Sequence, residues 1–309
     1  MLRISFLLMI ALSAVITPVA GSASDEIIVY TARKEHLVKP LFDAYTEKTG
    51  EMIKYITDKA APLLARLQAD GQNSPADMLI TVDAGNLWQA AEKGVLAPVK
   101  SETLEQNIPS HLRDPEGRWF GLSVRARTIV YATDRVKKTD LSTYENLRDP
   151  DWKGRLCLRK SKKAYNESLV AMMIAEKGEQ ATEDIVKGWV SNLATAPFSN
   201  DTKVMMAIAA GQCDVGIVNT YYYGRLLKKE KDIKLALFWP NQDDRGVHIN
   251  ISGAGVTSNA KNREQAIKLL EWLSAEDAQN IFASLNMEYP ANPAIKADAT
   301  VVAWGEFKQ

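Results

Sequence analysis

Three consecutive tyrosines, Tyr221, Tyr222 and Tyr223, follow an apolar run that begins at Val215. A phenol is a poor metal ligand near neutral pH, because its unperturbed pKa is about 10. A strongly charged cation overturns this preference by stabilising the phenolate. Holding a hard trivalent metal is therefore the leading task for several phenolates in one place. The alternative interpretation is an aromatic strand end that packs on the core.

The backbone around the tyrosines decides whether two neighbours can share one ion. Adjacent residues on a regular strand point to opposite faces. Tyr221 and Tyr222 can therefore meet one metal only if the chain turns at that point. Thr220 before them and the pair Gly224-Arg225 after them fit a strand that breaks into a helix.

The elements that must position these side chains alternate along the chain. Period-two and apolar runs predict strands at 26–30, 77–81, 121–131, 215–219 and 233–238. Helical spacing predicts a helix from Leu37 that stops at Gly50, and others at 60–69, 86–93, 167–177, 183–193, 202–210, 263–272 and 277–285. This alternation is typical of an α/β fold with a mostly parallel sheet covered on both faces.

Two such α/β halves, joined by extended strands such as the run at 121–131, predict a two-lobed binding protein. Ligands of such folds sit in the crevice between the lobes, near the carboxyl ends of strands. Closure by hinge motion around the ligand is the expected behaviour.

The N-terminus predicts export. Arg3 supplies a positive charge, the stretch 4–19 is apolar, and Gly21-Ser22-Ala23 offers small residues for cleavage, so residues 1–23 are expected to be a signal peptide. A membrane anchor is the alternative, but the run is shorter than the roughly 20 residues that a span prefers. We expect a soluble exported protein with no membrane span after cleavage.

Charge excludes two classes of partner. Lys plus Arg and Asp plus Glu both number 38, so the net charge is zero. No basic arm or stripe predicts nucleic-acid binding, and no polybasic amphipathic segment predicts a membrane surface.

The chain has two cysteines, Cys157 and Cys213. An even pair in an oxidising compartment usually forms a disulfide. The competing interpretations are a thiol metal site or a nucleophile, but there is no third cysteine and no nucleophile motif. We therefore expect the disulfide.

The sequence contains few of the residue patterns that indicate an enzyme. The three histidines, His36, His111 and His248, are not paired at helical spacing, so a zinc hydrolase is unsupported. No glycine-rich phosphate loop or nucleophile elbow is present. An exported enzyme is accordingly the weakest hypothesis.

Segments spread over nearly the whole chain resemble one family. They read IVYTAR (28–33), SPAD (74–77), TVDAGN (81–86), GLSVRAR (121–127), NLRDPDWKG (146–154), VNTYYY (218–223) and EYPANP (288–293). In this order and spacing, the chain resembles the tyrosine-rich subgroup of the periplasmic ferric-ion-binding proteins of bacterial ABC iron transporters.

The resemblance implies a set of iron ligands. Two adjacent tyrosines after an asparagine-containing strand match Tyr221 and Tyr222, and a third, from the opening of a helix in the same lobe, matches Tyr165. Tyr223 lies one position late and is expected to pack in the core.

The first ligand loop departs from the family pattern. Many members place histidine, or histidine and tyrosine, after the arginine of this loop, but here Lys34 and Glu35 occupy those positions and His36 lies beyond them. The acidic ligand that some members use aligns with Val82, which cannot coordinate, although Asp83 follows it. Glu35 is the candidate for an additional ligand.

The resemblance also implies an anion beside the iron, such as carbonate or bicarbonate. Arg33 and Arg125 are the candidate anion-binding residues, because a guanidinium can hold an oxyanion with two hydrogen bonds. Asn219 is expected to orient a phenolate or contact the anion, with a turn cap as its alternative role.

In this family the fold is a type II-like periplasmic binding protein, in which each lobe is a mixed sheet flanked by helices and hinge strands join the lobes. We expect residues 24–124 and about 250–285 in the N-lobe, and 125–249 and about 286–309 in the C-lobe. A monomer would deliver Fe³⁺ to an inner-membrane ABC permease without catalysis. The alternative is a binding protein for a small organic ion with the tyrosines as an aromatic box.

Overall fold

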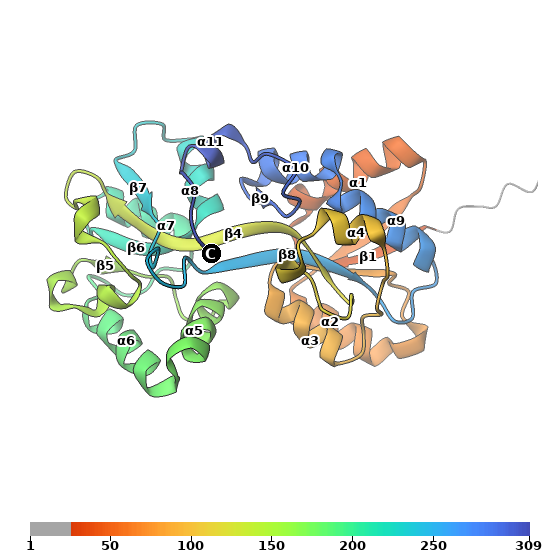
Figure 1. Ribbon diagram of the computed structural model, residues 1–309, viewed down its shortest axis with the longest axis horizontal. Helices are drawn as coiled ribbons and strands as arrows, with labels where there is room; N and C mark the ends of the chain where they lie inside the picture. Colours follow the sequence, from red (N-terminus) through yellow and green to blue (C-terminus); the bar gives the residue numbers. More distant parts are fainter. Residues whose placement is uncertain (1–25) are drawn as a thin grey trace, which may run out of the picture.

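The computed structural model describes residues 26–309, so the predicted signal peptide at 1–23 lies outside the described residues. Two α/β lobes lie end to end, and strands β4 (Phe120–Ala132) and β8 (Ile249–Val256) run between them (Figure 1). The prediction of a two-lobed α/β fold is confirmed.

The remaining strands are short and flank these two. They are β1 (Ile27–Thr31), β2 (Ile53–Thr57), β3 (Met78–Thr81), β5 (Leu156–Cys157), β6 (Val215–Asn219), β7 (Leu235–Phe238) and β9 (Tyr289–Pro290). The strand order is β2-β1-β3-β8-β4-β6-β5, and both β7 and β9 also pair with β4.

Strand β4 belongs to both lobes. Its first half, Phe120–Ala126, pairs antiparallel with β8, and its second half pairs antiparallel with β6 from Arg127 to Tyr131. All thirteen residues of β4 are buried, including Arg125 and Arg127. Burial on both faces explains why the run is mostly apolar, with Ser123, Thr128 and the two arginines as its polar residues.

The sheet is mixed rather than mostly parallel. Strands β1, β2 and β3 are parallel, as are β5 and β6, which agrees with the alternating sequence pattern. Strand β4 leads from the first lobe into the second, and β8 leads back into the first. Their pairings with each other, of β8 with β3 and of β4 with β6 are all antiparallel. The expectation of a mostly parallel sheet fails at these two connecting strands.

Helices cover both faces of each lobe's sheet. They are α1 (Glu35–Thr49), α2 (Ala60–Asp70), α3 (Ala84–Glu92), α4 (Glu102–Asn107), α5 (Ala164–Lys177), α6 (Glu179–Ser191), α7 (Asp201–Ala209), α8 (Thr220–Leu227), α9 (Arg263–Ser274), α10 (Glu276–Asn286) and α11 (Ala299–Val302). Short 3-10 turns lie at 71–73, 110–112, 138–140, 145–148 and 150–152.

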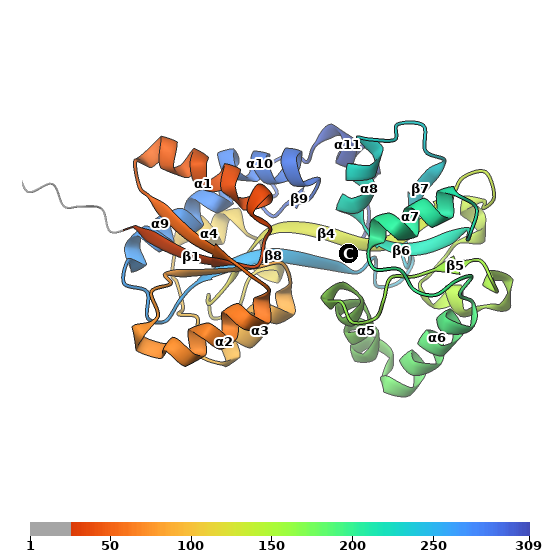
Figure 2. The same cartoon turned by 180° about the vertical axis from the view of Figure 1, so that it is seen from behind.

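The apolar cores follow this layering. In the first lobe, α1, α9 and α10 pack on one face of the sheet, and α2 and α3 pack on the other (Figure 2). In the second lobe, α5 and α6 share one cluster, while α7 and α8 share another. Helix α1 ends at Gly50, which adopts φ 77°, a left-handed conformation that glycine tolerates at little cost.

Cys157 and Cys213 form a disulfide, as the sequence predicts. It ties β5 to the turn before β6. None of the helices within residues 26–309 is long and apolar enough to cross a bilayer.

Candidate functional site

A cleft of about 170 Å³ opens where the lobes meet. Tyrosine, arginine and lysine side chains dominate its lining. The lining residues are Ala32, Arg33, Lys34, Leu37, Val82, Arg125, Tyr165, Tyr221, Tyr222, Arg225, Ser252 and Glu288. All three tyrosines predicted to bind metal are thus brought to one cleft, together with both predicted anion-binding arginines.

The first turns of two helices, α5 and α8, position the three phenol side chains. Tyr165 is the second residue of α5, and Tyr221 and Tyr222 are the second and third residues of α8. Strand β6 breaks into α8 directly before them, and successive residues on a helix diverge by about 100° rather than 180°. The rings of Tyr221 and Tyr222 consequently lie 4.5 Å apart, between centroids.

Tyr223 is turned away from the cleft. It is buried, and its hydroxyl donates a hydrogen bond to the carbonyl oxygen of Leu235 at 2.8 Å. This residue packs in the core, as expected from its position in the triplet.

The phenol of Tyr221 is strongly disfavoured as an anion without a cation. Burial raises the pKa of Tyr221 well above its usual value, and the neighbouring phenols of Tyr165 and Tyr222 raise it further, while Arg125 opposes the shift. A cation that enters the cleft must therefore displace the proton.

Arg33 is held by a buried ion pair. Its Nη2 donates to Oε2 of Glu288 at 3.0 Å, and the hydroxyl of Ser123 donates to the same oxygen at 2.6 Å. Burial favours the neutral acid, but the charges of Arg33 and Arg125 and these hydrogen bonds outweigh it, so the pKa of Glu288 lies below its usual value. Nε and Nη1 of Arg33 are buried with no hydrogen-bond partner among the described residues.

Arg125 lies on β4 at the boundary between the lobes. Its Nη1 donates to the hydroxyl of Ser252 at 3.3 Å, and its Nη2 donates to the carbonyl oxygen of Val82. The guanidinium carbon lies 5.7 Å from the ring centroid of Tyr165. Arg125 therefore contacts both lobes beside a candidate ligand.

Two further cations line the cleft, Lys34 and Arg225. The guanidinium of Arg225 lies 4.9 Å from the ring centroid of Tyr221, a cation–π distance. Four cationic side chains thus face the cleft against one carboxylate, Glu288. Such a balance suits phenolates and an anion better than it suits a cationic organic ligand.

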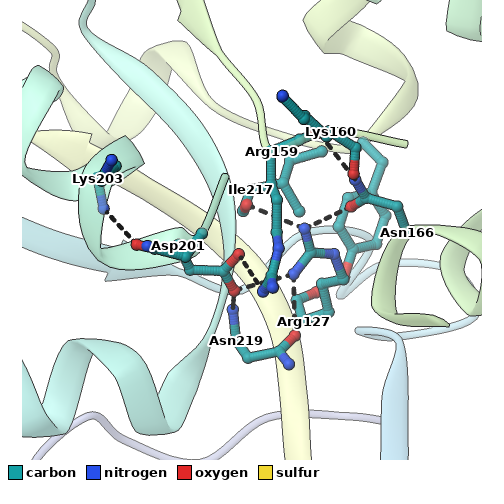
Figure 3. A network of polar contacts seen from close by, with 10 residues as sticks. Arg127, Arg159, Lys160, Asn166, Asp201, Lys203, Ile217 and Asn219 are labelled. Carbon is teal, nitrogen blue, oxygen red and sulfur yellow. Dashed lines mark hydrogen bonds and ion pairs between the residues drawn. The ribbon is translucent and has the colours of Figure 1, made fainter. Parts of the chain in front are cut away.

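A buried polar network supports the tyrosine-bearing segments (Figure 3). Asp201, the first residue of α7, forms ion pairs with Arg127 and Arg159 at 3.2 Å each. Arg127 also donates to Oδ1 of Asn219 at 3.0 Å. The side chain of Asn219 therefore faces Arg127, and it makes no cap for α8 although Asn219 occupies the N-cap position.

The N-lobe candidates lie apart from the tyrosines. Glu35 is exposed, accepts a hydrogen bond from the hydroxyl of Tyr55 at 3.2 Å, and is absent from the cleft lining. His36 is exposed as well. Asp83 caps α3 by accepting from the backbone N–H of Asn86 at 3.2 Å, so its carboxylate serves the fold.

Within residues 26–309, no group of three or more His, Cys, Asp or Glu side chains is placed to hold a metal ion. The oxygen donors that line the cleft among these residues include the phenols of Tyr165, Tyr221 and Tyr222 and the carboxylate of Glu288.

Sequence reasoning missed several residues of the site: Arg127, Arg159, Asp201, Arg225, Ser252 and Glu288. The available signal was charge inside apolar surroundings. Arg127 stands in the β4 run, and Glu288 stands within the segment EYPANP. A charged residue at a position expected to be buried needs a partner, and such pairs often mark a site.

A crevice between two α/β lobes that are joined by connecting strands, lined by tyrosines and cations, is typical of a two-lobed solute-binding protein. Comparison with known proteins supports the assignment to the solute-binding proteins. The chain belongs to the family of bacterial extracellular solute-binding proteins, because residues 73–307 match the model of that family.

Its relatives include iron-binding proteins. Iron uptake protein A1 of Synechocystis is 44% identical over 299 residues, covering 94% of this chain and 83% of the relative. A structure of the Trichodesmium protein IdiA (FutA), in complex with iron and citrate ligands, superposes with a TM-score of 0.86 at 43% identity, covering 92% of both chains. The ferric binding protein from Campylobacter jejuni superposes with a TM-score of 0.86 at 35% identity, again covering 92% of both chains. The resemblance to ferric-ion-binding proteins is confirmed.

Proposed function

We propose that this protein is an extracytoplasmic receptor that captures ferric ion through Tyr165, Tyr221 and Tyr222. One observation carries the proposal: phenols from two distant segments, the starts of α5 and α8, line the same cleft. The iron-binding relatives support the choice of metal.

The chemistry of the donor set favours a hard trivalent ion. Three phenolates carry three negative charges, so their sum with Fe³⁺ is zero and the cleft need not bury a net charge. Each phenol must lose its proton on binding. Because burial raises the pKa of Tyr221, iron affinity is expected to fall as the pH falls.

A small anion would complete the coordination that three protein ligands leave open. Carbonate or bicarbonate is the first choice, with Arg33 and Arg125 as its partners. Nε and Nη1 of Arg33 support this role, since both are buried donors without a partner in the described part of the chain, and an oxyanion would satisfy them. Citrate, which accompanies iron in the Trichodesmium structure, is a larger carboxylate that the same cations would also attract.

Coordination would come mainly from the C-lobe. Lys34 lines the cleft at the position where the family pattern described above would place histidine, and a lysine offers no ligand while it is charged. Glu35 remains the candidate for an additional ligand, but its carboxylate must first leave Tyr55 and turn into the cleft. Asn219 would act indirectly, through Arg127.

The wider biology forms part of the proposal. Residues 1–23 would direct export to the periplasm and be cleaved. The protein would work as a monomer, without catalysis, and pass its iron to an inner-membrane ABC permease. The lobes that close on the ion would comprise residues 24–124 with about 250–285, and 125–249 with about 286–309.

The decisive experiment is optical. Purified protein mixed with a ferric salt and bicarbonate is expected to turn orange to red, from charge transfer between phenolate and iron. Tyr222→Phe should lose the colour while its circular dichroism stays native. Tyr223→Phe is the matched control and should keep the colour, since that hydroxyl contacts Leu235 in the core. A colourless wild type, or an unchanged Tyr222→Phe variant, would refute the assignment.

A further inference from the structure

Asp201 is linked to both segments that carry the candidate ligands, directly to Asn219 before α8 and through Arg127 to Asn166 of α5 (Figure 3). It is the first residue of α7 and is fully buried. Its Oδ2 accepts from the backbone N–H of Asn219 at 2.9 Å and from Arg127, and its Oδ1 accepts from Arg159. A carboxylate at this depth persists only when it is paired in this way.

One branch of the network leads to α8. Asn219 is the last residue of β6 and the N-cap of α8, two positions before Tyr221. The hydrogen bond from its backbone N–H to Asp201 therefore fixes the point where the strand becomes a helix. The directions in which Tyr221 and Tyr222 project depend on that point.

A second branch leads to α5. Arg127, held by Asp201, donates from Nη2 to Oδ1 of Asn166 at 2.5 Å. Asn166 is the neighbour of Tyr165, and its Nδ2 donates to the carbonyl oxygen of Arg159 at 2.9 Å. The first turn of α5 is thus fastened to the segment before it and to the same aspartate.

A third branch lies against the rings. The guanidinium carbon of Arg159 is 5.2 Å from the ring centroid of Tyr165 and 5.9 Å from that of Tyr222. Arg159 therefore lies near phenols from both helices, while its ion pair with Asp201 at 3.2 Å holds it in place.

We infer that Asp201 is the positioning residue that sets the separation between Tyr165 and the pair Tyr221–Tyr222. This inference rests on the proposed function, in which these phenols bind one ion. Ligands on separate elements must be held to within a fraction of an ångström, and the groups behind them do so. Asp201 touches no ligand directly and acts through Asn219, Arg127 and Arg159.

The same lobe offers a matched control. Asp214 also pairs with two arginines, accepting from Nε of Arg135 at 2.8 Å and from Nε of Arg155 at 2.7 Å. None of these three residues lines the cleft. Asp214 is partly exposed, whereas Asp201 is fully buried, but both pair with two arginines. Asp214→Asn therefore removes the same charge from a similar pairing without touching the tyrosine-bearing helices.

The test compares Asp201→Asn with Asp214→Asn. In Asp201→Asn we expect iron affinity, measured by competition with citrate, to fall at least tenfold and the charge-transfer band to shift or weaken. In the iron-free protein, amides of residues 163–167 and 219–223 should exchange hydrogen faster. Asp214→Asn should lower the melting temperature only.

Asn166→Ala provides a second variant in case Asp201→Asn does not fold. It cuts the α5 branch alone and should move the band and speed exchange at 163–167 while 219–223 stays unchanged. A coloured wild type together with wild-type band and affinity in these variants would overturn the inference alone. A wild type that gives no colour would overturn the proposed function and the inference with it.

Discussion

Arg33 donates a hydrogen bond to Glu288 at 3.0 Å, although 255 positions separate them in the chain. The two side chains are 2% and 6% exposed. The pair therefore joins the loop after β1 to the segment after α10 inside the protein. It also holds the guanidinium beside the cleft, where Nε and Nη1 have no hydrogen-bond partner within residues 26–309.

Glu288→Gln is expected to destabilise the protein by about 3–5 kcal/mol at neutral pH, because it leaves the charge of Arg33 buried without its partner. Urea unfolding measures the loss. Asp43→Asn, which breaks the exposed pair of Asp43 with Lys39, is the control and should leave the urea midpoint close to that of wild type.

The stability difference between wild type and Glu288→Gln is expected to depend on pH. Burial opposes ionisation of Glu288, but Arg33 and Arg125 hold its pKa in the folded protein below the ordinary value of 4.5. Its contribution to the free energy of unfolding is thus complete above that ordinary value and is lost as the pH falls through the folded pKa. The advantage of wild type over Glu288→Gln should shrink in acid; an advantage that grows in acid would contradict the pairing.

Arg33→Ala is expected to weaken the bicarbonate dependence of iron binding. Wild-type affinity should rise with bicarbonate, because the anion would satisfy buried donors of Arg33. Arg33→Lys keeps a charge for Glu288 but lacks the fork, so it should fall between the two. Titrations with and without bicarbonate decide the matter, and an identical dependence in all three proteins would exclude the anion role.

Asn250 links the lobes near the cleft. Its Nδ2 donates to Asp83 at 2.7 Å and to Ser168 of α5 at 2.9 Å, and its Oδ1 accepts from the backbone N–H of Ala84 at 3.0 Å. Asn250→Ala should cost about 1–3 kcal/mol, because it leaves buried partners unsatisfied. It should also increase the radius of gyration of the iron-free protein in small-angle X-ray scattering.

Asn86→Ala is the control for Asn250→Ala. Asn86 donates to the same carboxylate, Asp83, at 3.3 Å, but it does not reach the other lobe. The radius of gyration should therefore stay at the wild-type value in Asn86→Ala. An equal change in both variants would show that Asn250 does not restrain the lobes.

Reduction of the Cys157–Cys213 disulfide should lower the free energy of unfolding by about 4 kcal/mol, since the closed loop spans 56 positions and the bond restricts the unfolded chain. Urea titration with and without a reductant measures this. A variant with both cysteines changed to alanine should not respond to the reductant. Equal midpoints for oxidised and reduced wild type would argue against any stabilising role.

The sequence predicted the elements that carry periodic patterns. Helix α1 with its stop at Gly50, strand β6, and the long run of β4 were all expected. Strand β2 was not, because its exposed and half-buried residues at the edge of the sheet produce no apolar run. The directions of β4 and β8 were not predicted either, since periodicity does not encode pairing partners.

Some residues of the candidate site were predicted from the sequence and others were not. Tyr165, Tyr221 and Tyr222 were predicted as ligands from ligand chemistry and family resemblance, and all three line one cleft; their role as ligands stays a prediction. Asp201 and Glu288 escaped notice because their partners lie 74 and 255 positions away, at Arg127 and Arg33. A carboxylate at the start of a helix also looks like an ordinary favourable first-turn charge, as Asp201 does.

Strand β4 contributes backbone hydrogen bonds to sheets on both sides of the cleft. The lobes are consequently joined by a hydrogen-bonded strand that belongs to both sheets, and this strand is stiffer than a flexible linker would be. Under an optical trap that pulls on the chain ends, we expect tension to reach both sheets through this strand. Rupture should then occur as one cooperative event rather than two independent ones.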